Sequence, residues 1–252
     1  MHSLKLPFVP GREKSPICYL FGASPSGFAF TPSKRPQDYW LALDGGFKRL
    51  QEQKKSFAVD MVLGDFDSYL EASKTNVSQA YTDRQIEQLS NAELRKMLGL
   101  RTTQELIHLP IHKDLTDMEA ALHWALALPC DPFILLGATG GRLDHTLANI
   151  QCLKQLAHKQ RHVIVIDSGY QLAVLDPTTE LTINEAKHTR LSLFALSDEV
   201  AGLNITGTEY EAQNLTLSND KPLAISNQIL TKDVRISLKK GYVLVYLETQ
   251  PI

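Results

Sequence analysis

The sequence predicts an α/β domain with an open, mostly parallel sheet, followed by a small all-β sandwich domain. Two observations lead to this prediction. Up to about residue 167, short apolar runs alternate with helical patterns, which is typical of βα units in a parallel sheet. After about residue 170, short segments that alternate apolar and polar residues lie between turn-forming clusters, which favours an antiparallel sandwich or barrel.

The first domain is expected to contain six strands and three helices. Several of the strand runs are apolar without alternation, as expected for strands covered on both faces. The strand runs are ICYLFG near 17–22, YWLALD near 39–44, VDMVLG near 59–64, LIHLP near 106–110, PFILLG near 132–137 and HVIVID near 162–167. The helical patterns are GFKRLQEQ, DMEAALHWALAL and DHTLANIQCLKQLAHK. In the second domain, the strand runs are QLAVL, ELTI, RLSLFAL, NLTLS, VRISL and YVLVYLE.

We therefore divide the 252 residues into an N-terminal extension (1–16), an α/β domain (17–169) and a β-sandwich domain (170–252). Residues 69–105 form a long polar insertion in the α/β domain, to which the sequence assigns no chemistry. Its part DRQIEQLSNAELRKMLGL is helical in pattern, with Ser90 as the expected cap.

Composition limits the classes of function. A net charge of −2 gives no reason to expect nucleic acid as a partner, and the absence of an apolar run of 18 residues argues against a membrane span. The first residues also lack the apolar core of a signal peptide, so a cytoplasmic protein is expected. Cys18, Cys130 and Cys152 stand in apolar contexts and are expected to be buried, reduced thiols.

Four polar clusters follow predicted strands, where ligands bind in open parallel sheets. The first is LDGG, with Asp44, Gly45 and Gly46, where glycines permit either a tight turn or close approach to a ligand. The second is GDFDS. In an extended segment Asp65 and Asp67 would point to the same side, and two such carboxylates repel unless a cation lies between them or one is protonated. An acidic turn is the alternative explanation.

The third cluster is KDLTDMEAALHWALAL. Thr116 and Glu119 match a capping box, so a helix should begin near Asp117. The capping box does not account for Lys113 and Asp114. A third carboxylate at a strand end would complete a cation site.

The fourth cluster is GATGGRLDHTLAN, a glycine-rich loop that leads into a helix and forms a ready anion site. It matches neither the Walker A loop nor the dinucleotide fingerprint. Arg142 can hold a phosphate with its fork of donors. Acids, one arginine and glycine-rich turns at strand ends together indicate Mg²⁺-assisted phosphate chemistry.

The four clusters in this order resemble the thiamine pyrophosphokinase family. The second domain continues the likeness with RLSLFAL, ITGTEY and LAISNQ, so that the resemblance runs from about residue 17 to 247. It implies transfer of the pyrophosphoryl group of ATP to the hydroxyl of thiamine, with release of AMP. It also implies an α/β domain followed by a β-sandwich, in a homodimer whose active sites are shared between subunits.

The resemblance assigns site residues by match. The implied Mg²⁺ ligands and catalytic acids are Asp65, Asp67 and Asp117, with Arg142 and Asp144 also at the reacting groups. The implied ATP-binding residues are Asp44, Gly45, Gly46, Lys113, Asp114, Thr116, Gly140, Gly141 and Arg142. The implied thiamine-binding residues are Asp144, Tyr210, Ser226 and Asn227, with Tyr210 stacking on thiamine from the partner subunit.

Two departures from the family pattern stand out. The 69–105 insertion lengthens the spacing from GDFDS to KDLTD, and SNQ replaces the usual SNE, which puts an acidic contact there in doubt. The carboxylate that accepts the hydroxyl proton is left open. The alternatives are a pyrophosphokinase that acts on a hydroxymethylpterin and a nucleotide- or thiamine-binding sensor without turnover.

Overall fold

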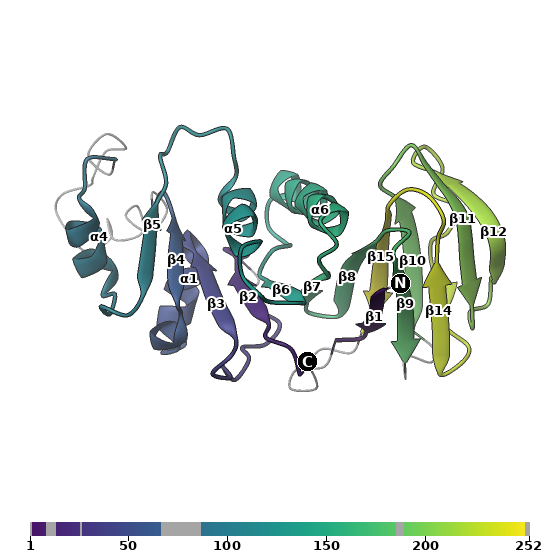
Figure 1. Cartoon of the computed structure of the whole chain (residues 1–252), viewed down its shortest axis with the longest axis horizontal. Helices are drawn as coiled ribbons and strands as arrows, with labels where there is room; N and C mark the ends of the chain where they lie inside the picture. The colour runs from purple at the N-terminus through teal and green to yellow at the C-terminus, as the bar shows by residue number, and fades with distance from the viewer. Residues whose placement is uncertain (1, 9–13, 26, 67–86, 185–188, 250–252) are drawn as a thin grey trace. The chain divides into compact units, whose positions relative to one another are not determined.

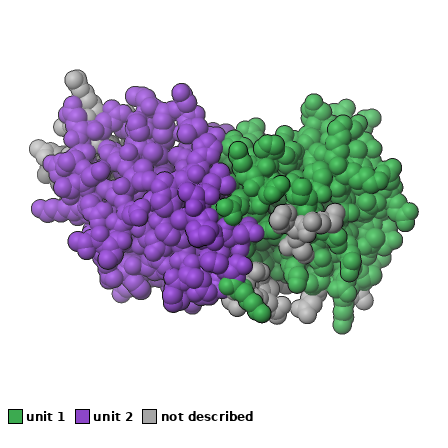
Figure 2. Space-filling model, in the orientation of Figure 1, with its two compact units in different colours: residues 1–14, 132–134, 150–252 green, residues 15–131, 135–149 purple. Residues whose placement is uncertain are grey.

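The computed structural model describes residues 2–8, 14–25, 27–66, 87–184 and 189–249 (Figure 1). The chain forms two compact units, which Figure 2 shows in different colours. Unit 2 comprises residues 15–131 and 135–149, and unit 1 comprises residues 1–14, 132–134 and 150–252. The division passes through a strand and a helix, β6 (Phe133–Leu136) and α6 (Leu143–His158).

The sheet of unit 2 has the strand order β6-β2-β3-β4-β5. Its strands, besides β6, are β2 (Cys18–Phe21), β3 (Tyr39–Leu43), β4 (Met61–Gly64) and β5 (Glu105–His108). Neighbours from β2 to β5 pair in parallel, as the sequence predicts. Every residue of β2, β4 and β6 is buried, whereas β5 at the edge is only partly buried. The runs without alternation are therefore the strands that are covered on both faces.

The predicted helices of unit 2 are confirmed. They are α1 (Asp44–Glu52), α4 (Asn91–Leu98) inside the insertion, α5 (Asp117–Ala125) and the first part of α6, with a short 3₁₀ turn, η1 (Ser56–Ala58). Ser90 caps α4 with a full capping box, as predicted. Helix α5 ends three residues before the predicted Leu128. Pro129 disfavours helical backbone at Leu128, so the helix cannot readily extend that far. Both α1 and α5 pack against β3 and β4.

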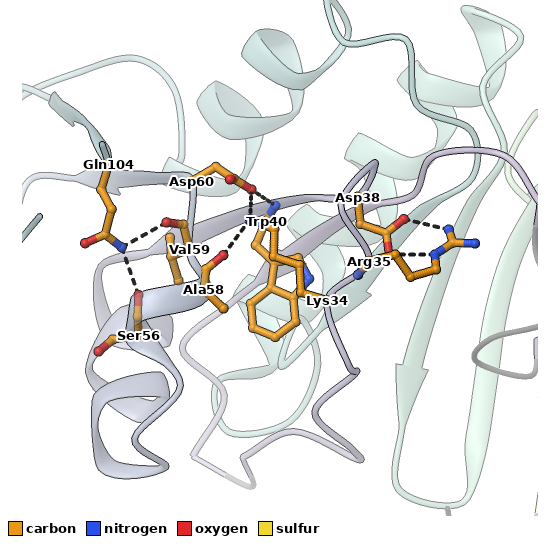
Figure 3. Close-up of polar contacts among 9 residues, drawn as sticks. All are labelled: Lys34, Arg35, Asp38, Trp40, Ser56, Ala58, Val59, Asp60 and Gln104. Carbon is orange, nitrogen blue, oxygen red and sulfur yellow. Dashed lines mark hydrogen bonds and ion pairs between the residues drawn. The ribbon is translucent and has the colours of Figure 1, made fainter. Parts of the chain in front are cut away.

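Polar side chains fix the amino ends of three strands of unit 2, at the edge of the sheet opposite the predicted site (Figure 3). Just before β3, the carboxylate of Asp38 accepts hydrogen bonds from the Ile17 amide at 3.1 Å and from Arg35 Nη2 at 2.6 Å. Before β4, Asp60 Oδ2 accepts from the Trp40 amide at 2.7 Å. These bonds tie neighbouring strands together through their loops, so the opposite edge can carry a functional site on a rigid frame.

Unit 1 holds two sets of strands. One sheet has the order β1-β9-β14-β11-β12, and the other strands follow the order β13-β10-β15-β8-β7. The bounds are β1 (His2–Leu6), β7 (Val163–Asp167), β8 (Tyr170–Leu175), β9 (Thr179–Asn184), β10 (Arg190–Ala195), β11 (Glu199–Thr206), β12 (Ala212–Ser218), β13 (Asn227–Gln228), β14 (Asp233–Ser237) and β15 (Val243–Glu248). The six strand runs predicted for the second domain are all present.

The N-terminal residues form a strand that the sequence does not reveal. Strand β1 pairs in parallel with β9, with Leu4 opposite Leu181. The pairs β7–β8, β8–β15, β10–β15, β10–β13, β9–β14, β11–β14 and β11–β12 are antiparallel. Buried and partly exposed residues alternate along β9, which gives the sheet one covered face. A five-residue run carries too little pattern to predict such a pairing with a segment more than 170 residues away.

All three cysteines are buried and free, which confirms that prediction. Among the residues that the structure describes, no helix is long and apolar enough to cross a membrane.

Candidate active site

A cavity of about 560 Å³ lies at the carboxyl ends of the strands of unit 2. This volume is in the range that holds a small-molecule ligand. Segments that follow all five strands of this sheet contribute to its lining, so the predicted clusters do meet at one edge. From the predicted residues, the lining contains Asp44, Gly45, Asp65, Lys113, Thr116, Asp117, Gly140 and Arg142. Gly46, Asp114, Gly141 and Asp144 lie outside it.

Asp44 is a buried carboxylate at the start of a helix. It is the first residue of α1 and is only 6% exposed. The positive end of the helix dipole favours a negative charge in this first turn. A Cβ added at Gly46 would collide with the carbonyl oxygen of Phe21 in β2. The structure therefore gives Gly46 a packing role that brings α1 against the sheet, while Gly45 lines the cavity.

Asp65 follows β4 and lines the cavity, whereas Asp67 lies outside the described residues. Phe66 between them is buried and has a φ of 60°, which is the left-handed region. This conformation costs a residue with a side chain about 1–2 kcal/mol, which burial of the phenyl ring offsets. The chain is thus not extended at Phe66, so the extended geometry expected for the GDFDS motif is not present at this residue.

Lys113 brings two of the predicted metal ligands together. Its ammonium nitrogen lies 2.6 Å from Asp65 Oδ2, 2.9 Å from Asp117 Oδ1 and 3.2 Å from the carbonyl oxygen of Pro110. Burial lowers the pKa of Lys113, but the hydrogen bonds and charges of the two carboxylates outweigh burial and raise it. The amine therefore remains an ammonium ion at neutral pH. Within the described residues, no three acidic, histidine or cysteine side chains gather as a metal cluster.

Helix α5 begins at Asp117, as the sequence predicts. Thr116 is its N-cap, and the threonine hydroxyl accepts a hydrogen bond from the Glu119 amide at 3.1 Å. The cap fixes the position of Asp117 in the first turn, where it faces Lys113.

The glycine-rich loop after β6 closes another side of the cavity. Asn149 of α6 donates a hydrogen bond from Nδ2 to the Ala138 carbonyl at 2.6 Å and so holds the loop against the helix. Arg142 forms a two-pronged pair with Asp144, at 3.2 Å from Nε and 2.6 Å from Nη2. That hydrogen bond from Arg142 lowers the pKa of Asp144, and both side chains are largely exposed to solvent. Arg142 is therefore accessible to an anionic ligand.

Sequence reasoning missed the segment after β2. Gly22, Ala23, Ser24 and Pro25 line the cavity beside Gly137, and the Ser24 amide donates to the Gly137 carbonyl at 3.0 Å. The signal was the same strand-end position that identified the other four clusters, but GASPSG contains no charged residue to draw attention to it.

Three of the four predicted thiamine residues, Tyr210, Ser226 and Asn227, lie in unit 1, whereas Asp144 belongs to unit 2. Tyr210 is 68% exposed, although its backbone is held firmly. The buried Asn227 side chain accepts from the Tyr210 amide at 2.9 Å and donates to the Tyr210 carbonyl at 2.8 Å and to Thr208 Oγ1 at 3.1 Å. Ser226 has a φ of 55° and donates its amide to Ser192 Oγ at 2.9 Å. The amide group of Asn227 thus forms hydrogen bonds with the Tyr210 backbone, and the exposed Tyr210 ring is available to contact a ligand.

These features define a class of protein. The cavity lies at the carboxyl edge of a parallel sheet, where phosphate-binding α/β proteins bind their ligands. It is lined by glycine-rich loops, by an arginine, and by two carboxylates that pair with the ammonium of Lys113. A β-rich unit follows in the chain.

Comparison with known families identifies the particular one. The family model of the thiamin pyrophosphokinase catalytic domain matches residues 33–166, and that of the thiamin pyrophosphokinase vitamin B1 binding domain matches residues 178–243. The chain belongs to the thiamin pyrophosphokinase family, which confirms the resemblance read from the motifs.

Individual relatives agree with this assignment. The chain is 26% identical to thiamine pyrophosphokinase of Bacillus subtilis over 211 residues, which is 83% of this chain and 87% of that protein. It is 25% identical to thiamin pyrophosphokinase 1 of Caenorhabditis elegans over 234 residues, with 86% and 83% covered.

Solved structures of similar proteins confirm the fold class. The structure of thiamine pyrophosphokinase from Bacillus subtilis has a TM-score of 0.73 at 23% identity, with 93% of this chain and 99% of that chain covered. The structure of thiamin pyrophosphokinase from Geobacillus thermodenitrificans has a TM-score of 0.70 at 26% identity, with 93% and 98% covered.

Proposed function

We propose that the chain transfers the pyrophosphoryl group of ATP to the hydroxyl of thiamine and releases AMP. Its function is that of a thiamine pyrophosphokinase, an ATP-dependent thiamine diphosphokinase. The observation that carries the site assignment is the convergence of Asp44, Asp65, Lys113, Asp117 and Arg142 on one cavity within the matched catalytic region. ATP is the co-substrate, and its phosphates are proposed to lie against the loop after β6 and Arg142.

Mg²⁺ is the proposed metal, and the residues present fit it. The carboxylates of Asp65 and Asp117 already converge on one positive charge, that of Lys113. Carboxylate oxygens with ATP phosphates are the donor set that Mg²⁺ uses in nucleotide enzymes. When bound, the metal would neutralise charge that develops on the phosphate oxygens. Asp67, the third proposed ligand, lies outside the described residues.

The transfer itself is a substitution at phosphorus. The thiamine hydroxyl oxygen forms a bond to the β-phosphorus, the bond from that phosphorus to the oxygen shared with the α-phosphate breaks, and the hydroxyl proton passes to a base. The protein residues orient the phosphates and offset their charge, with Arg142 donating to non-bridging oxygens. The buried Asp44 and the carboxylates beside Lys113 are the candidates for the base.

Thiamine is proposed to stack on Tyr210, with Ser226 and Asn227 beside it. The exposed ring on a firmly held backbone supports this role, since a cationic ring over tyrosine gains roughly 0.5–2 kcal/mol. We also propose a homodimer in which Tyr210 serves the partner's catalytic unit. The exposed side chains of Phe194, Leu223 and Ile225 in unit 1 support an interface there. A cytoplasmic location also remains a proposal, based on the sequence.

The reaction is tested with purified protein, ATP, Mg²⁺ and either thiamine or a hydroxymethylpterin. Thiamine should give AMP and thiamine diphosphate in equal amounts. Release of ADP would rule out pyrophosphoryl transfer, and AMP formation with the pterin alone would establish the related pyrophosphokinase. Tight ATP binding with no AMP from either alcohol would establish a sensor.

The shared site is tested by mixing two inactive variants, Asp65→Asn and Tyr210→Ala. Random subunit exchange should restore about a quarter of the sites, because each mixed dimer holds one intact site. If mixed dimers form and stay inactive, each site lies within one chain. A fully active monomer in sedimentation would contradict the dimer as well.

A further inference from the structure

The ammonium group of Lys113 is surrounded by three oxygens. Two are carboxylate oxygens, Asp65 Oδ2 at 2.6 Å and Asp117 Oδ1 at 2.9 Å, and the third is the Pro110 carbonyl at 3.2 Å. The three charged side chains are mostly shielded from water, with exposures of 15% for Lys113, 13% for Asp65 and 28% for Asp117. Such shielding strengthens the attraction relative to a surface ion pair.

This arrangement is not a by-product of helical periodicity. Lys113 lies four residues before Asp117, but it belongs to the segment that precedes α5, which begins only at Asp117. Asp65 lies 48 residues away in the chain and comes from the end of β4. The loop after β5 therefore folds so that its lysine stands between two acids from different elements.

The ammonium of Lys113 also offsets the negative charge of the two carboxylates. Two carboxylates that face one another repel and would favour a proton on one of them. A single ammonium between them offsets this repulsion and holds both side chains in place. An Mg²⁺ ion bound by the same two acids would need the position that the ammonium now fills.

We propose that Lys113 is a resident counter-ion, which holds the Asp65 and Asp117 carboxylates in the metal-free protein and releases them when Mg²⁺ arrives with ATP. This inference rests on the proposed function, because it takes the two acids as metal ligands. Mg²⁺ alone must displace the ammonium without offering it another partner. When Mg²⁺ binds with ATP, the phosphate oxygens can accept hydrogen bonds from the released ammonium. Each of the two ligands, metal and nucleotide, should therefore raise the affinity of the protein for the other.

The test compares Mg²⁺ binding in the parent protein and in Lys113→Met, by calorimetry and by the shift in melting temperature. The probes are Mg²⁺ alone, a non-hydrolysable ATP analogue alone, and the two together. Lys113→Met should bind Mg²⁺ alone about tenfold or more tightly than the parent, and the coupling between metal and nucleotide should fall by a similar factor. Equal Mg²⁺ affinities in the two proteins would overturn the proposal.

Lys34→Met is the matched control. Lys34 Nζ pairs with Asp60 Oδ2 at 2.5 Å and bonds the Ala58 carbonyl at 2.6 Å, in a partly shielded ion pair at the opposite edge of the sheet (Figure 3). This control should lose stability without any change in Mg²⁺ affinity. A gain in Mg²⁺ affinity equal to that of Lys113→Met would overturn the proposal, because the effect would then be general.

Lys113→Gln covers the case in which Lys113→Met does not fold without metal. Glutamine can still hydrogen-bond to a carboxylate but carries no charge, so it should also gain Mg²⁺ affinity. Lys113→Arg keeps the positive charge and should bind Mg²⁺ with an affinity close to that of the parent. These measurements need no thiamine. The two proposals can therefore fail separately. If the parent forms thiamine diphosphate but the Lys113 variants bind Mg²⁺ like the parent, the proposed function holds and the counter-ion proposal is wrong.

Discussion

The side chain of Asn227 offers a direct test of how Tyr210 is held. Replacing it in Asn227→Asp keeps the acceptor for the Tyr210 amide but removes the donor to the Tyr210 carbonyl at 2.8 Å and to Thr208 Oγ1 at 3.1 Å. It also places a carboxylate oxygen against a carbonyl oxygen in a site where Asn227 is 6% exposed. The substitution therefore changes hydrogen bonding and charge while shape is almost unchanged.

The size of the effect follows from the lost bonds. Each lost hydrogen bond costs about 0.5–1.5 kcal/mol, and a buried group left without its partner costs about 1–3 kcal/mol. We expect the free energy of unfolding to fall by about 2–4 kcal/mol at pH 7. Urea denaturation measures this loss, and a shift of the midpoint with an unchanged m-value shows that stability itself has changed. The KM for thiamine should rise while the KM for ATP stays near the parent value.

Gln171→Glu is a control with the same chemistry at another place. The buried Gln171 side chain accepts from the Phe8 amide at 2.7 Å and donates to the Phe8 carbonyl at 3.1 Å. It should lose a similar amount of stability but leave the KM for thiamine unchanged. An Asn227→Asp protein as stable as the parent would refute the reasoning about hydrogen bonds. An equal rise of KM in both variants would refute the specific role in placing Tyr210.

Three further predictions concern unit 2. Asp65→Asn should lower kcat/KM roughly a hundredfold or more, measured by AMP release, and a variant with parent activity would remove Asp65 from the site. Asp38 is buried, which raises its pKa, but hydrogen bonds from Arg35 and Ile17 outweigh burial and lower the pKa. The ionised Asp38 therefore contributes its full stabilisation above about pH 4, and this contribution is lost as the pH falls through the lower pKa of the folded state. Asp38→Asn should make the free energy of unfolding, measured with urea, depend less on pH in this acidic range. An unchanged pH dependence would contradict this. Gly46→Ala should destabilise by about 1–3 kcal/mol or more in thermal unfolding, because its Cβ collides with the Phe21 carbonyl, and an unchanged melting temperature would refute that contact.

The structure also decides the sign of one effect on stability. If the two acids of GDFDS only repelled each other, neutralising one of them would hold or raise stability. Since Lys113 pairs with Asp65 at 2.6 Å, Asp65→Asn removes an attraction and should lower stability modestly. The sign of the effect thus depends on a lysine that lies 48 residues away in the chain.

Local features of the sequence were enough to predict the architecture. Apolar runs without alternation marked β2, β4 and β6 as strands covered on both faces. Alternation marked six strands of unit 1, β8, β9, β10, β12, β14 and β15, but not β1, β11 or β13. The caps at Ser90 and Thr116 placed the starts of α4 and α5. These signals work because periodicity and capping involve residues within one or two turns of each other. The order of polar clusters after the strands then identified the family.

Only the tertiary structure decided how distant groups meet. The position of Lys113 between Asp65 and Asp117, the hold of Asn227 on Tyr210 and the pairing of β1 with β9 all join segments far apart in the chain. The left-handed conformation of Phe66 likewise overrides the extended geometry that the motif suggested. Such contacts depend on the packing of whole elements and on loop conformations that no local pattern encodes. The sequence by itself therefore determined which residues stand at the strand ends, and packing decided which of them touch.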